Sequence, residues 1–283
     1  MKFNDSPVGI FDSGLGGLTV FKEIRKILPF EDLIYFGDTA RVPYGNKSKE
    51  TIIKYSSEIL EFLTGRKVKI VVVACNTSSS LALDDLRKKA GVPVFGVIEP
   101  GAKKAVEVSS GGNIAVIGTS ATIQSRAYSI AIHKEITFLN GDKSRRFNNG
   151  FKIIEKACPL FVPLVEEGFL NQEITKSVIN HYLSSLIVEK PSCLVLGCTH
   201  YPMLKDLISA EIGGNTEIID SGIETAEVVK NYLKKNGMLK VGAEKGGELF
   251  FVSDDIEKFK ELGGKFLGRP IENVGLTDGD VIK

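Results

Sequence analysis

Short apolar runs alternate along this chain with longer segments in which apolar residues recur every three or four positions. The runs indicate buried strands, and the periodic segments indicate amphipathic helices. Because the runs are apolar throughout, both faces of each strand are expected to be covered, as in a parallel sheet with helices on both sides. The pattern therefore predicts an α/β fold. Strands are expected at 8–11, 33–36, 68–74, 93–98, 113–117, 193–196, 217–220 and 248–252, and helices at 48–63, 80–90, 172–188 and 223–233.

The strand, loop and helix pattern restarts near residue 110, so the chain has two halves of similar design. In the second half the apolar run 136–139 is expected to follow as the next strand after 113–117, and 159–167 is expected to be a loop or short helix. The second half is complete by about residue 209, and the residues that follow are expected to return to the first half and complete it. We predict two similar lobes, each a mostly parallel sheet flanked by helices, related by a pseudo-twofold axis with the ligand cleft between them. One lobe is expected to comprise 1–97 together with 209–283, and the other 98–208.

Composition narrows the possible partners. The chain has 283 residues, and its 36 basic and 35 acidic residues give a net charge of +1. This balance favours neither a nucleic acid nor an anionic membrane. No apolar run approaches the roughly 20 residues that span a bilayer, and the first residues lack the apolar stretch of a signal peptide. We expect a cytoplasmic protein with reduced thiols that acts on a small molecule.

Two of the four cysteines, Cys75 and Cys198, stand in matching settings. Each ends a short apolar run and is followed by a polar segment that opens a helix: Asn76 and Thr77 follow the first, and Thr199 and His200 follow the second. In open α/β sheets, ligands bind at the carboxyl ends of strands. The two thiols are therefore expected on opposite walls of one site.

The other two cysteines, Cys158 and Cys193, are expected to be small buried side chains, which is the usual place of a free cysteine. The chain contains no CxxC pair. Zinc requires about four ligands, and Cys193, Cys198 and His200 would supply only three, which strand alternation would separate. No metal site is expected.

Two thiols on opposite sides of a substrate suit the inversion of a stereocentre. The proton leaves the carbon on one face and returns on the other, and a single fixed group cannot reach both faces. A disulfide would bring the two Cα atoms within about 6 Å and leave no room for a substrate. Acyl transfer uses one cysteine with a histidine and leaves the second cysteine unexplained. A single-cysteine hydrolase and a non-catalytic amino-acid-binding module remain as alternatives.

The loop after the first strand contains Gly14-Leu15-Gly16-Gly17. It approaches the dinucleotide-binding pattern, but Thr19 stands where the last glycine is required. The glycines either let backbone N–H groups approach a small anion or form a plain tight turn. Both interpretations place Asp12 and Ser13 at the end of the strand, although Asp12 alone could be a helix cap. Further along, Asp38 and Arg41 are expected to pair and to shape the loop that carries Tyr44.

Several segments of the chain resemble the aspartate/glutamate racemase family, and glutamate racemases in particular. They occur in family order and spacing between about residues 8 and 202, with Val42 as a departure at a position that is not catalytic. The segments are 9–18, 35–45, 72–79, 158–166 and 196–202.

This resemblance implies a cofactor-independent enzyme that converts L-glutamate to D-glutamate for peptidoglycan synthesis and that forms a homodimer. It implies that Cys75 handles the proton on the D-glutamate face and Cys198 the proton on the L-glutamate face, assisted by Asp12 and His200. The absence of lysine from the motif loops agrees, because pyridoxal phosphate needs a Schiff-base lysine. An aspartate racemase of the same superfamily is the nearest alternative, and the segments 12–17 and 158–166 favour glutamate. The residues implied to bind the substrate are Asp12, Ser13, Pro43, Tyr44, Gly45, Asn76, Thr77, Thr119, Thr122, Glu166, Thr199 and His200.

Overall fold

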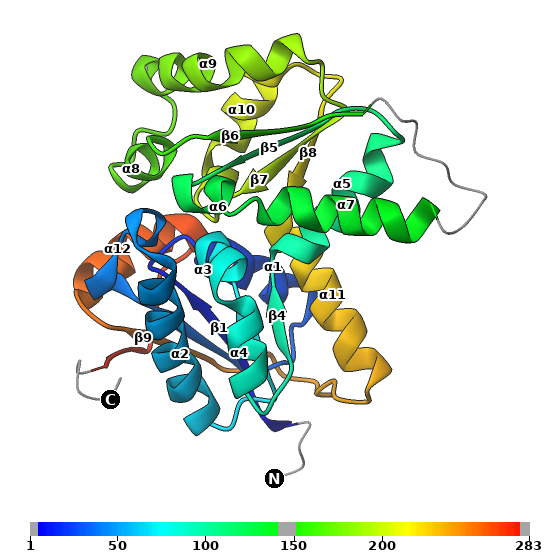
Figure 1. Cartoon of the computed structure of the whole chain (residues 1–283). Coiled ribbons are helices and arrows are strands. Elements are labelled where there is room, and N and C mark those ends of the chain that lie inside the picture. The colour runs from blue at the N-terminus through cyan, green and yellow to red at the C-terminus, as the bar shows by residue number, and fades with distance from the viewer. Residues whose placement is uncertain (1–4, 141–150, 278–283) are drawn as a thin grey trace. The chain divides into compact units, whose positions relative to one another are not determined.

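The computed structural model describes residues 5–140 and 151–277. The chain divides into two compact units: unit 1 comprises Met1–Val97 and Gly222–Lys283, and unit 2 comprises Ile98–Ser221. Figure 1 shows this division by colour, because unit 1 combines the blue and cyan start of the chain with its orange end, whereas unit 2 is mostly green and yellow.

The chain leaves unit 1 at the position expected from the sequence, but it returns later than expected. The return falls after residue 221 rather than after 208. The physical reason is a strand pairing, because β8 (Glu217–Asp220) lies parallel to β7 (Cys193–Gly197) and completes the sheet of unit 2. Residues 209–221 therefore belong to unit 2.

Unit 1 is built on a six-stranded sheet, and every described strand pairing in it is parallel. Its spatial order is β10-β9-β2-β1-β3-β4. The strands in chain order are β1 (Val8–Asp12), β2 (Leu33–Gly37), β3 (Ile70–Val73), β4 (Val94–Gly96), β9 (Glu248–Val252) and β10 (Val274–Leu276). Its helices are α1 (Leu18–Ile27), α2 (Lys49–Gly65), α3 (Asn76–Leu81), α4 (Leu83–Lys89), α11 (Ser221–Lys235) and α12 (Ile256–Leu267), with short 3₁₀ turns η2 (Thr39–Arg41) and η3 (Tyr44–Asn46).

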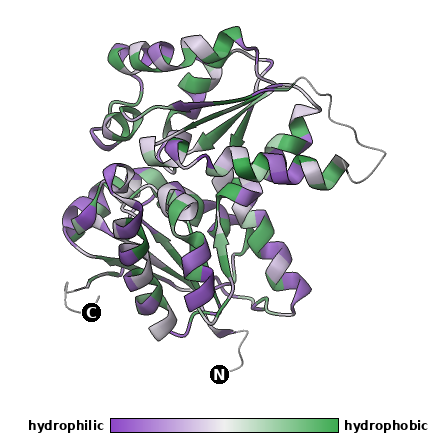
Figure 2. Ribbon diagram, viewed as in Figure 1, coloured by the Kyte–Doolittle hydropathy of each residue, from purple (hydrophilic) through white to green (hydrophobic). Residues whose placement is uncertain are grey.

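Successive residues of β2 show how both faces of this sheet are covered. Tyr35 contacts Phe21 of α1 and Phe259 of α12, each with ring centroids 6.0 Å apart. Phe36 contacts Phe62 of α2 at 4.9 Å. Since side chains alternate across a strand, the two contacts mark opposite faces. Figure 2 shows hydrophobic colour concentrated on the strands of both sheets. Within the described residues, no helix is long and apolar enough to cross a membrane.

Unit 2 is built on a four-stranded sheet with the spatial order β6-β5-β7-β8, also parallel in every described pairing. Figure 1 shows α9 and α10 on one side of this sheet and α5 and α7 on the other. The α/β class and the parallel sheets expected from the sequence are thus confirmed. The remaining elements of unit 2 are β5 (Ile114–Gly118), β6 (Ile153–Ala157), α5 (Ile98–Ser109), α6 (Ser120–Gln124), α7 (Ala127–Asn140), α8 (Phe161–Glu166), α9 (Glu173–Val188), η4 (Tyr201–Leu204) and α10 (Lys205–Ile212).

The second strand of unit 2 is not the apolar run 136–139, which lies inside helix α7. In that helix Ile132 and Ile136, one turn apart, are buried, whereas Phe138 is exposed. The strand is instead β6, whose sequence Ile-Ile-Glu-Lys-Ala is half-buried throughout because it lies at the edge of the sheet. Glu155 and Lys156 interrupt in β6 the continuous apolar run that marks a central strand.

Both sheets have a point where the strand order reverses. In unit 1, β1 has β2 on one side and β3 on the other. In unit 2, β5 has β6 on one side and β7 on the other. The loops that follow β1 and β3, or β5 and β7, therefore lead away in opposite directions, and such a switch point is where open α/β sheets bind ligands.

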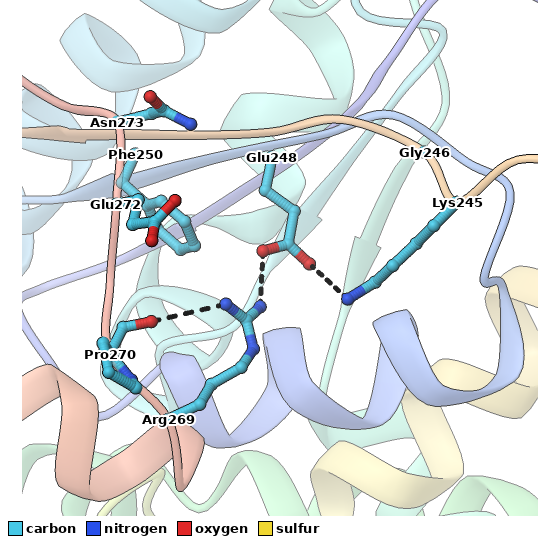
Figure 3. Close-up of a pocket in the computed structure, with 8 residues that line it drawn as sticks. All are labelled: Lys245, Gly246, Glu248, Phe250, Arg269, Pro270, Glu272 and Asn273. Carbon is cyan, nitrogen blue, oxygen red and sulfur yellow. Dashed lines mark hydrogen bonds and ion pairs between the residues drawn. The ribbon is translucent and has the colours of Figure 1, made fainter.

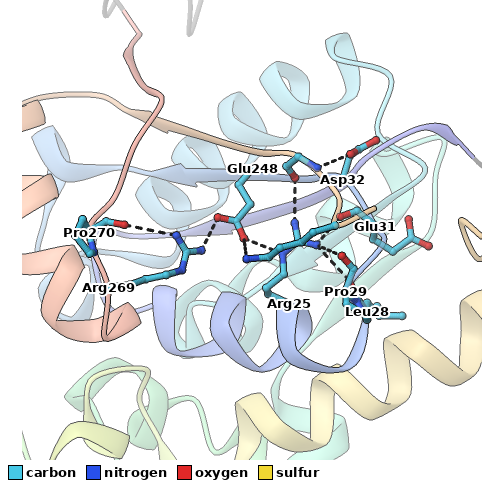
Figure 4. A network of polar contacts seen from close by, with 10 residues as sticks. Arg25, Leu28, Pro29, Glu31, Asp32, Glu248, Arg269 and Pro270 are labelled. Atoms are coloured by element: carbon cyan, nitrogen blue, oxygen red, sulfur yellow. Dashed lines mark hydrogen bonds and ion pairs between the residues drawn. The ribbon is translucent and has the colours of Figure 1, made fainter. Parts of the chain in front are cut away.

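Polar contacts hold the returning segment of the chain against the amino-terminal edge of the unit 1 sheet (Figure 4). Arg25 donates from Nε to Glu248 at 2.8 Å and from Nη2 to the carbonyl of Gly247 at 3.0 Å. The buried Lys69 ammonium lies 2.6 Å from Glu31, whose other oxygen accepts the N–H of Lys240 at 2.8 Å. These contacts position β9 beside β2, although the two strands lie far apart in the sequence.

Candidate active site

Cys75 lies at the switch point of the unit 1 sheet, two residues after the end of β3. Its side chain caps α3, because Sγ accepts the N–H of Ser78 at 3.5 Å. Sγ also lies 3.6 Å from the hydroxyl oxygen of Ser13. Asp12 ends the neighbouring strand β1, is fully buried, and accepts the N–H of Gly14 at 3.0 Å. The structure thus brings Asp12, Ser13 and Cys75 together.

The surroundings of Cys75 favour the neutral thiol. Burial raises the pKa of Cys75, the carboxylate of Asp12 raises it further, and hydrogen bonds from Ser78 and Ser13 oppose the change in part, so that the pKa is about 11. At neutral pH Cys75 therefore carries its proton. Asn76 and Thr77 begin α3 beside it, and both are buried.

The glycine-rich loop is packed closely against Asp12. A Cβ atom at Gly17 would lie 2.4 Å from Cβ of Asp12 and 2.9 Å from the hydroxyl oxygen of Tyr35. That hydroxyl donates to the carbonyl of Gly14 at 2.8 Å, and the N–H of Gly14 is bound to Asp12. These contacts favour the tight-turn interpretation of the loop, in which the glycines allow close approach.

The loop that carries Tyr44 is organised around the buried carboxylate of Asp38. One oxygen accepts from Nε of Arg41 at 2.7 Å and from the Tyr44 hydroxyl, and the other accepts from the Ser253 hydroxyl at 2.8 Å. The expected pair of Asp38 and Arg41 is confirmed. The Tyr44 hydroxyl is therefore engaged inside the loop, while Pro43, which follows a cis peptide bond, is exposed. Gly45 is half-buried.

Cys198 occupies the equivalent place in unit 2, directly after β7. Its Sγ lies 4.0 Å from Nδ1 of His200. The other ring nitrogen, Nε2, lies 3.0 Å from a carboxylate oxygen of Glu166, the last residue of α8. The three side chains form a line of thiol, imidazole and carboxylate.

The imidazole of His200 is held in its charged form. Burial lowers the pKa of His200, but the hydrogen bonds and charges of Cys198 and Glu166 outweigh burial and raise it to about 10. At neutral pH His200 is therefore an imidazolium between a thiol and a carboxylate. The two cysteines consequently differ: Cys75 lies beside an anion and Cys198 beside a cation.

Small hydroxyl residues complete the unit 2 set. Thr119 follows β5 and caps α6, accepting the N–H of Thr122 at 3.3 Å, and the two hydroxyl oxygens are 3.0 Å apart. Thr199 is buried directly after Cys198. Each unit thus gathers its own share of the residues expected from the sequence: Asp12, Ser13, Pro43, Tyr44, Gly45, Cys75, Asn76 and Thr77 in unit 1, and Thr119, Thr122, Glu166, Cys198, Thr199 and His200 in unit 2.

The remaining cysteines are buried as expected, each with no exposed surface. Sequence reasoning missed one contributor to the site, Ser253. It lies after β9 in the returning segment, and its hydroxyl contacts Asp38 and also accepts the N–H of Ala40 at 2.9 Å. No local pattern marks this serine, because its partners are more than 200 residues away in the sequence.

A cavity of about 440 Å³ lies at the opposite, amino-terminal edge of the unit 1 sheet (Figure 3). Its cations share one carboxylate: Glu248 lies 2.8 Å from Arg25 and 3.9 Å from Lys245, and it also pairs with Arg269. None of the site residues expected from the sequence lines this cavity, and its two lining cations, Lys245 and Arg269, both pair with Glu248. The lining residues are Lys245, Gly246, Glu248, Phe250, Arg269, Pro270, Glu272 and Asn273.

Known proteins share both the sequence and the fold of this chain. A glutamate racemase from Geobacter metallireducens is 48% identical over 267 residues, which cover 94% of each chain. The crystal structure of a glutamate racemase isoform from Bacillus anthracis matches with a TM-score of 0.90 at 36% identity, over 98% of both chains. A glutamate racemase from Francisella tularensis, crystallised in complex with D-glutamate, matches with a TM-score of 0.87 at 36% identity, over 97% of this chain and 98% of that one.

The family assignment follows from the extent of these matches. The profile of the Asp/Glu/Hydantoin racemase family matches residues 9–229, which include both cysteines with their strands and the line of Cys198, His200 and Glu166. This chain belongs to the Asp/Glu/Hydantoin racemase family.

Proposed function

We propose that this chain is a glutamate racemase that interconverts L- and D-glutamate, supplies D-glutamate for peptidoglycan synthesis, and uses Cys75 and Cys198 as its two proton-transferring groups. The substrate assignment is supported by relatives up to 48% identical over nearly the whole chain that are glutamate racemases. It is also supported by the Francisella tularensis relative, whose structure was obtained with D-glutamate.

The observation that carries the mechanism is the position of the two thiols. Each lies within two residues of the end of a central strand, at the switch point of its own parallel sheet. We propose that both units bind the same glutamate, so that one cysteine contacts each face of Cα. This arrangement supplies the two groups that inversion requires.

The charges beside the two thiols suit the conversion of L-glutamate to D-glutamate. Cys198, which lies beside the His200 imidazolium, acts as the thiolate base and removes the Cα proton from one face. The neutral thiol of Cys75 then donates its proton to the other face. One proton is taken and one is given, so the product differs from the substrate only in configuration.

The reverse reaction uses the opposite property of Cys75. A thiol whose pKa is raised to about 11 is a stronger base once it has lost its proton. The carboxylate of Asp12, by raising that pKa, makes the Cys75 thiolate a better acceptor for the Cα proton of D-glutamate. We therefore propose that Asp12 assists Cys75, and that Glu166 assists Cys198 by holding His200.

Hydrogen-bond donors beside both cysteines suit the two carboxylates and the ammonium of glutamate. Fixed donors of this kind stabilise the charge that develops when Cα loses its proton. We propose that the substrate contacts Ser13, Pro43, Tyr44, Gly45, Asn76 and Thr77 from unit 1, and Thr119, Thr122 and Thr199 from unit 2, together with the four catalytic residues Asp12, Cys75, Cys198 and His200.

The test is loss of optical activity in solutions of single enantiomers without added cofactor. We expect the circular dichroism of L-glutamate and of D-glutamate to decay to zero, and that of L-aspartate to decay at least about 100-fold more slowly. Faster decay with aspartate would assign the chain to aspartate racemisation. An unchanged signal with both amino acids would favour the binding module, and full activity in either Cys75→Ser or Cys198→Ser would favour single-cysteine chemistry.

Two further expectations from the sequence stay predictions. A homodimer is expected by resemblance, and the molar mass in solution, measured by light scattering after gel filtration, tests it. A cytoplasmic location is tested by fractionating the cells that produce the protein.

A further inference from the structure

Tyr201 follows His200 directly and is completely buried in unit 2. Its hydroxyl donates to the carbonyl oxygen of Cys158 at 2.8 Å. Its ring meets the ring of Phe161 edge to face, with centroids 5.1 Å apart. Two conspicuous segments of the sequence, 158–166 and 196–202, are therefore joined through one side chain.

These two segments carry the groups that must meet at the unit 2 site. His200 belongs to the loop after β7, and Glu166 ends α8, which begins three residues after Cys158. The strands that precede the segments, β6 and β7, are not neighbours, because β5 lies between them. Hydrogen bonds of the sheet therefore do not connect β6 directly to β7, whereas Tyr201 does connect the segments that follow them.

The Tyr201 contact acts at the start of the helix that places Glu166. The carbonyl of Cys158 also accepts the N–H of Phe161, the first residue of α8, at 3.2 Å. This six-residue helix is about 9 Å long, so a shift at its first turn is transmitted to its last residue. Burial raises the pKa of the Tyr201 phenol well above its ordinary value, so the hydroxyl remains a neutral donor.

We propose that Tyr201 is a positioning residue that sets the 3.0 Å separation between the His200 imidazole and the Glu166 carboxylate by locking the loop after β7 to the segment 158–166. Tyr201 does not touch the reacting atoms. It acts through His200, and its consequence for catalysis rests on the proposed racemase function. The lock itself is a property of the fold and can be measured without any substrate.

Substitution Tyr201→Phe removes the hydroxyl and keeps the ring against Phe161. The matched control is Tyr182→Phe: Tyr182 also contacts the Phe161 ring, with centroids 5.4 Å apart, and within residues 5–140 and 151–277 its hydroxyl has no hydrogen-bond partner. A second control is Cys158→Ala, which removes the thiol and keeps the carbonyl that accepts from Tyr201. Both controls are expected to behave like the unsubstituted protein.

The structural readout is the titration of the His200 ring, followed by NMR of protein with ¹⁵N-labelled histidine. The chain has three histidines, and His133 and His181 are exposed, so they serve as references in the same spectra. His200 is expected to titrate near its raised pKa of about 10 in the unsubstituted protein. In Tyr201→Phe its pKa is expected to fall by about one or more, because a longer distance to Glu166 weakens the pair.

The kinetic readout is racemisation in both directions. Tyr201→Phe is expected to lower kcat about tenfold with KM within about twofold, less than the ~100-fold loss that a 1 Å misplacement can cause. An unchanged His200 titration in folded Tyr201→Phe would overturn the proposal, as would an equal change in Tyr182→Phe. If Tyr201→Phe does not fold, Phe161→Leu tests the same lock from its other contact and must lower the His200 pKa. A lowered His200 pKa in a protein that does not racemise glutamate would support the lock and refute only the proposed function.

Discussion

The substitution Asp12→Asn is expected to make Cys75 more reactive towards an alkylating reagent. Asparagine has nearly the same shape as aspartate and keeps an oxygen that can accept the N–H of Gly14, so the tight packing against Gly17 is preserved. The negative charge beside the thiol is lost. Since that charge is the second cause, after burial, of the raised Cys75 pKa, the pKa must fall.

The magnitude follows from the two causes. The pKa of Cys75 is raised from 9.0 to about 11. We expect that loss of the Asp12 charge lowers this pKa by about 1. At pH 8 the thiolate fraction then rises from about 0.1% to about 1%. Intrinsic nucleophilicity falls about threefold for the same change in pKa. The net expectation is alkylation about threefold faster, because the tenfold gain in thiolate outweighs the threefold loss of nucleophilicity.

The assay is iodoacetamide labelling at pH 8, with modification of the Cys75 peptide quantified by mass spectrometry. Asp84→Asn, which changes an exposed carboxylate in the first turn of α4, is the matched control and should leave the labelling rate unchanged. Labelling of Cys75 in Asp12→Asn at an unchanged or lower rate would refute the reasoning about the charge beside this thiol.

Three further predictions concern the stability and loops of the protein. Gly17→Ala is expected to lower the free energy of unfolding by about 1–3 kcal/mol in urea titrations, since the added methyl group meets Asp12; Gly65→Ala, where a Cβ meets nothing within 4 Å, should not lower it. Ser253→Ala is expected to raise KM for glutamate and to cost about 1–3 kcal/mol of stability, because Asp38 and Ala40 each lose a hydrogen bond; an unchanged KM would show that the Tyr44 loop does not depend on the returning segment. The free energy of unfolding is also expected to depend on pH, because the pKa of His200 is raised from 6.5 to about 10 in the folded protein. The stabilisation from protonated His200 is fully present below pH 6.5 and is lost as the pH rises to about 10, so the free energy of unfolding should decline between about pH 7 and 10. The substitution His200→Asn should flatten that decline.

The central strands could be predicted from the sequence because burial on both faces produces uninterrupted apolar runs. The runs at 70–73 and 193–197 lie where the sequence places strands, and the cysteines that follow them lie at the switch points. The strand β6 carries no such signal, because Glu155 and Lys156 interrupt its apolar run. The run 136–139 misled for the related reason that a short apolar run fits a helix as well as a strand.

The features that could not be predicted from the sequence depend on contacts between segments that lie far apart in the chain. The resemblance implied that Glu166 belongs to the substrate site, but its 3.0 Å approach to His200 depends on the lock through Tyr201 and Cys158. The binding of Asp38 by Ser253 depends on β9 pairing with β2. The end of unit 2 depends on β8 pairing with β7. In each case the decisive partner lies on another element, and no local spacing identifies it.

The most direct test of the two-cysteine mechanism is the fate of deuterium when L-glutamate is racemised in D₂O. With one group on each face, the proton removed by Cys198 is not returned to the same face, and the proton delivered by Cys75 comes from solvent. At low conversion, mass spectrometry of the separated enantiomers should therefore find deuterium at Cα of D-glutamate and almost none in the remaining L-glutamate. Equal deuterium in both enantiomers at low conversion would show that a single group serves both faces and would contradict the mechanism.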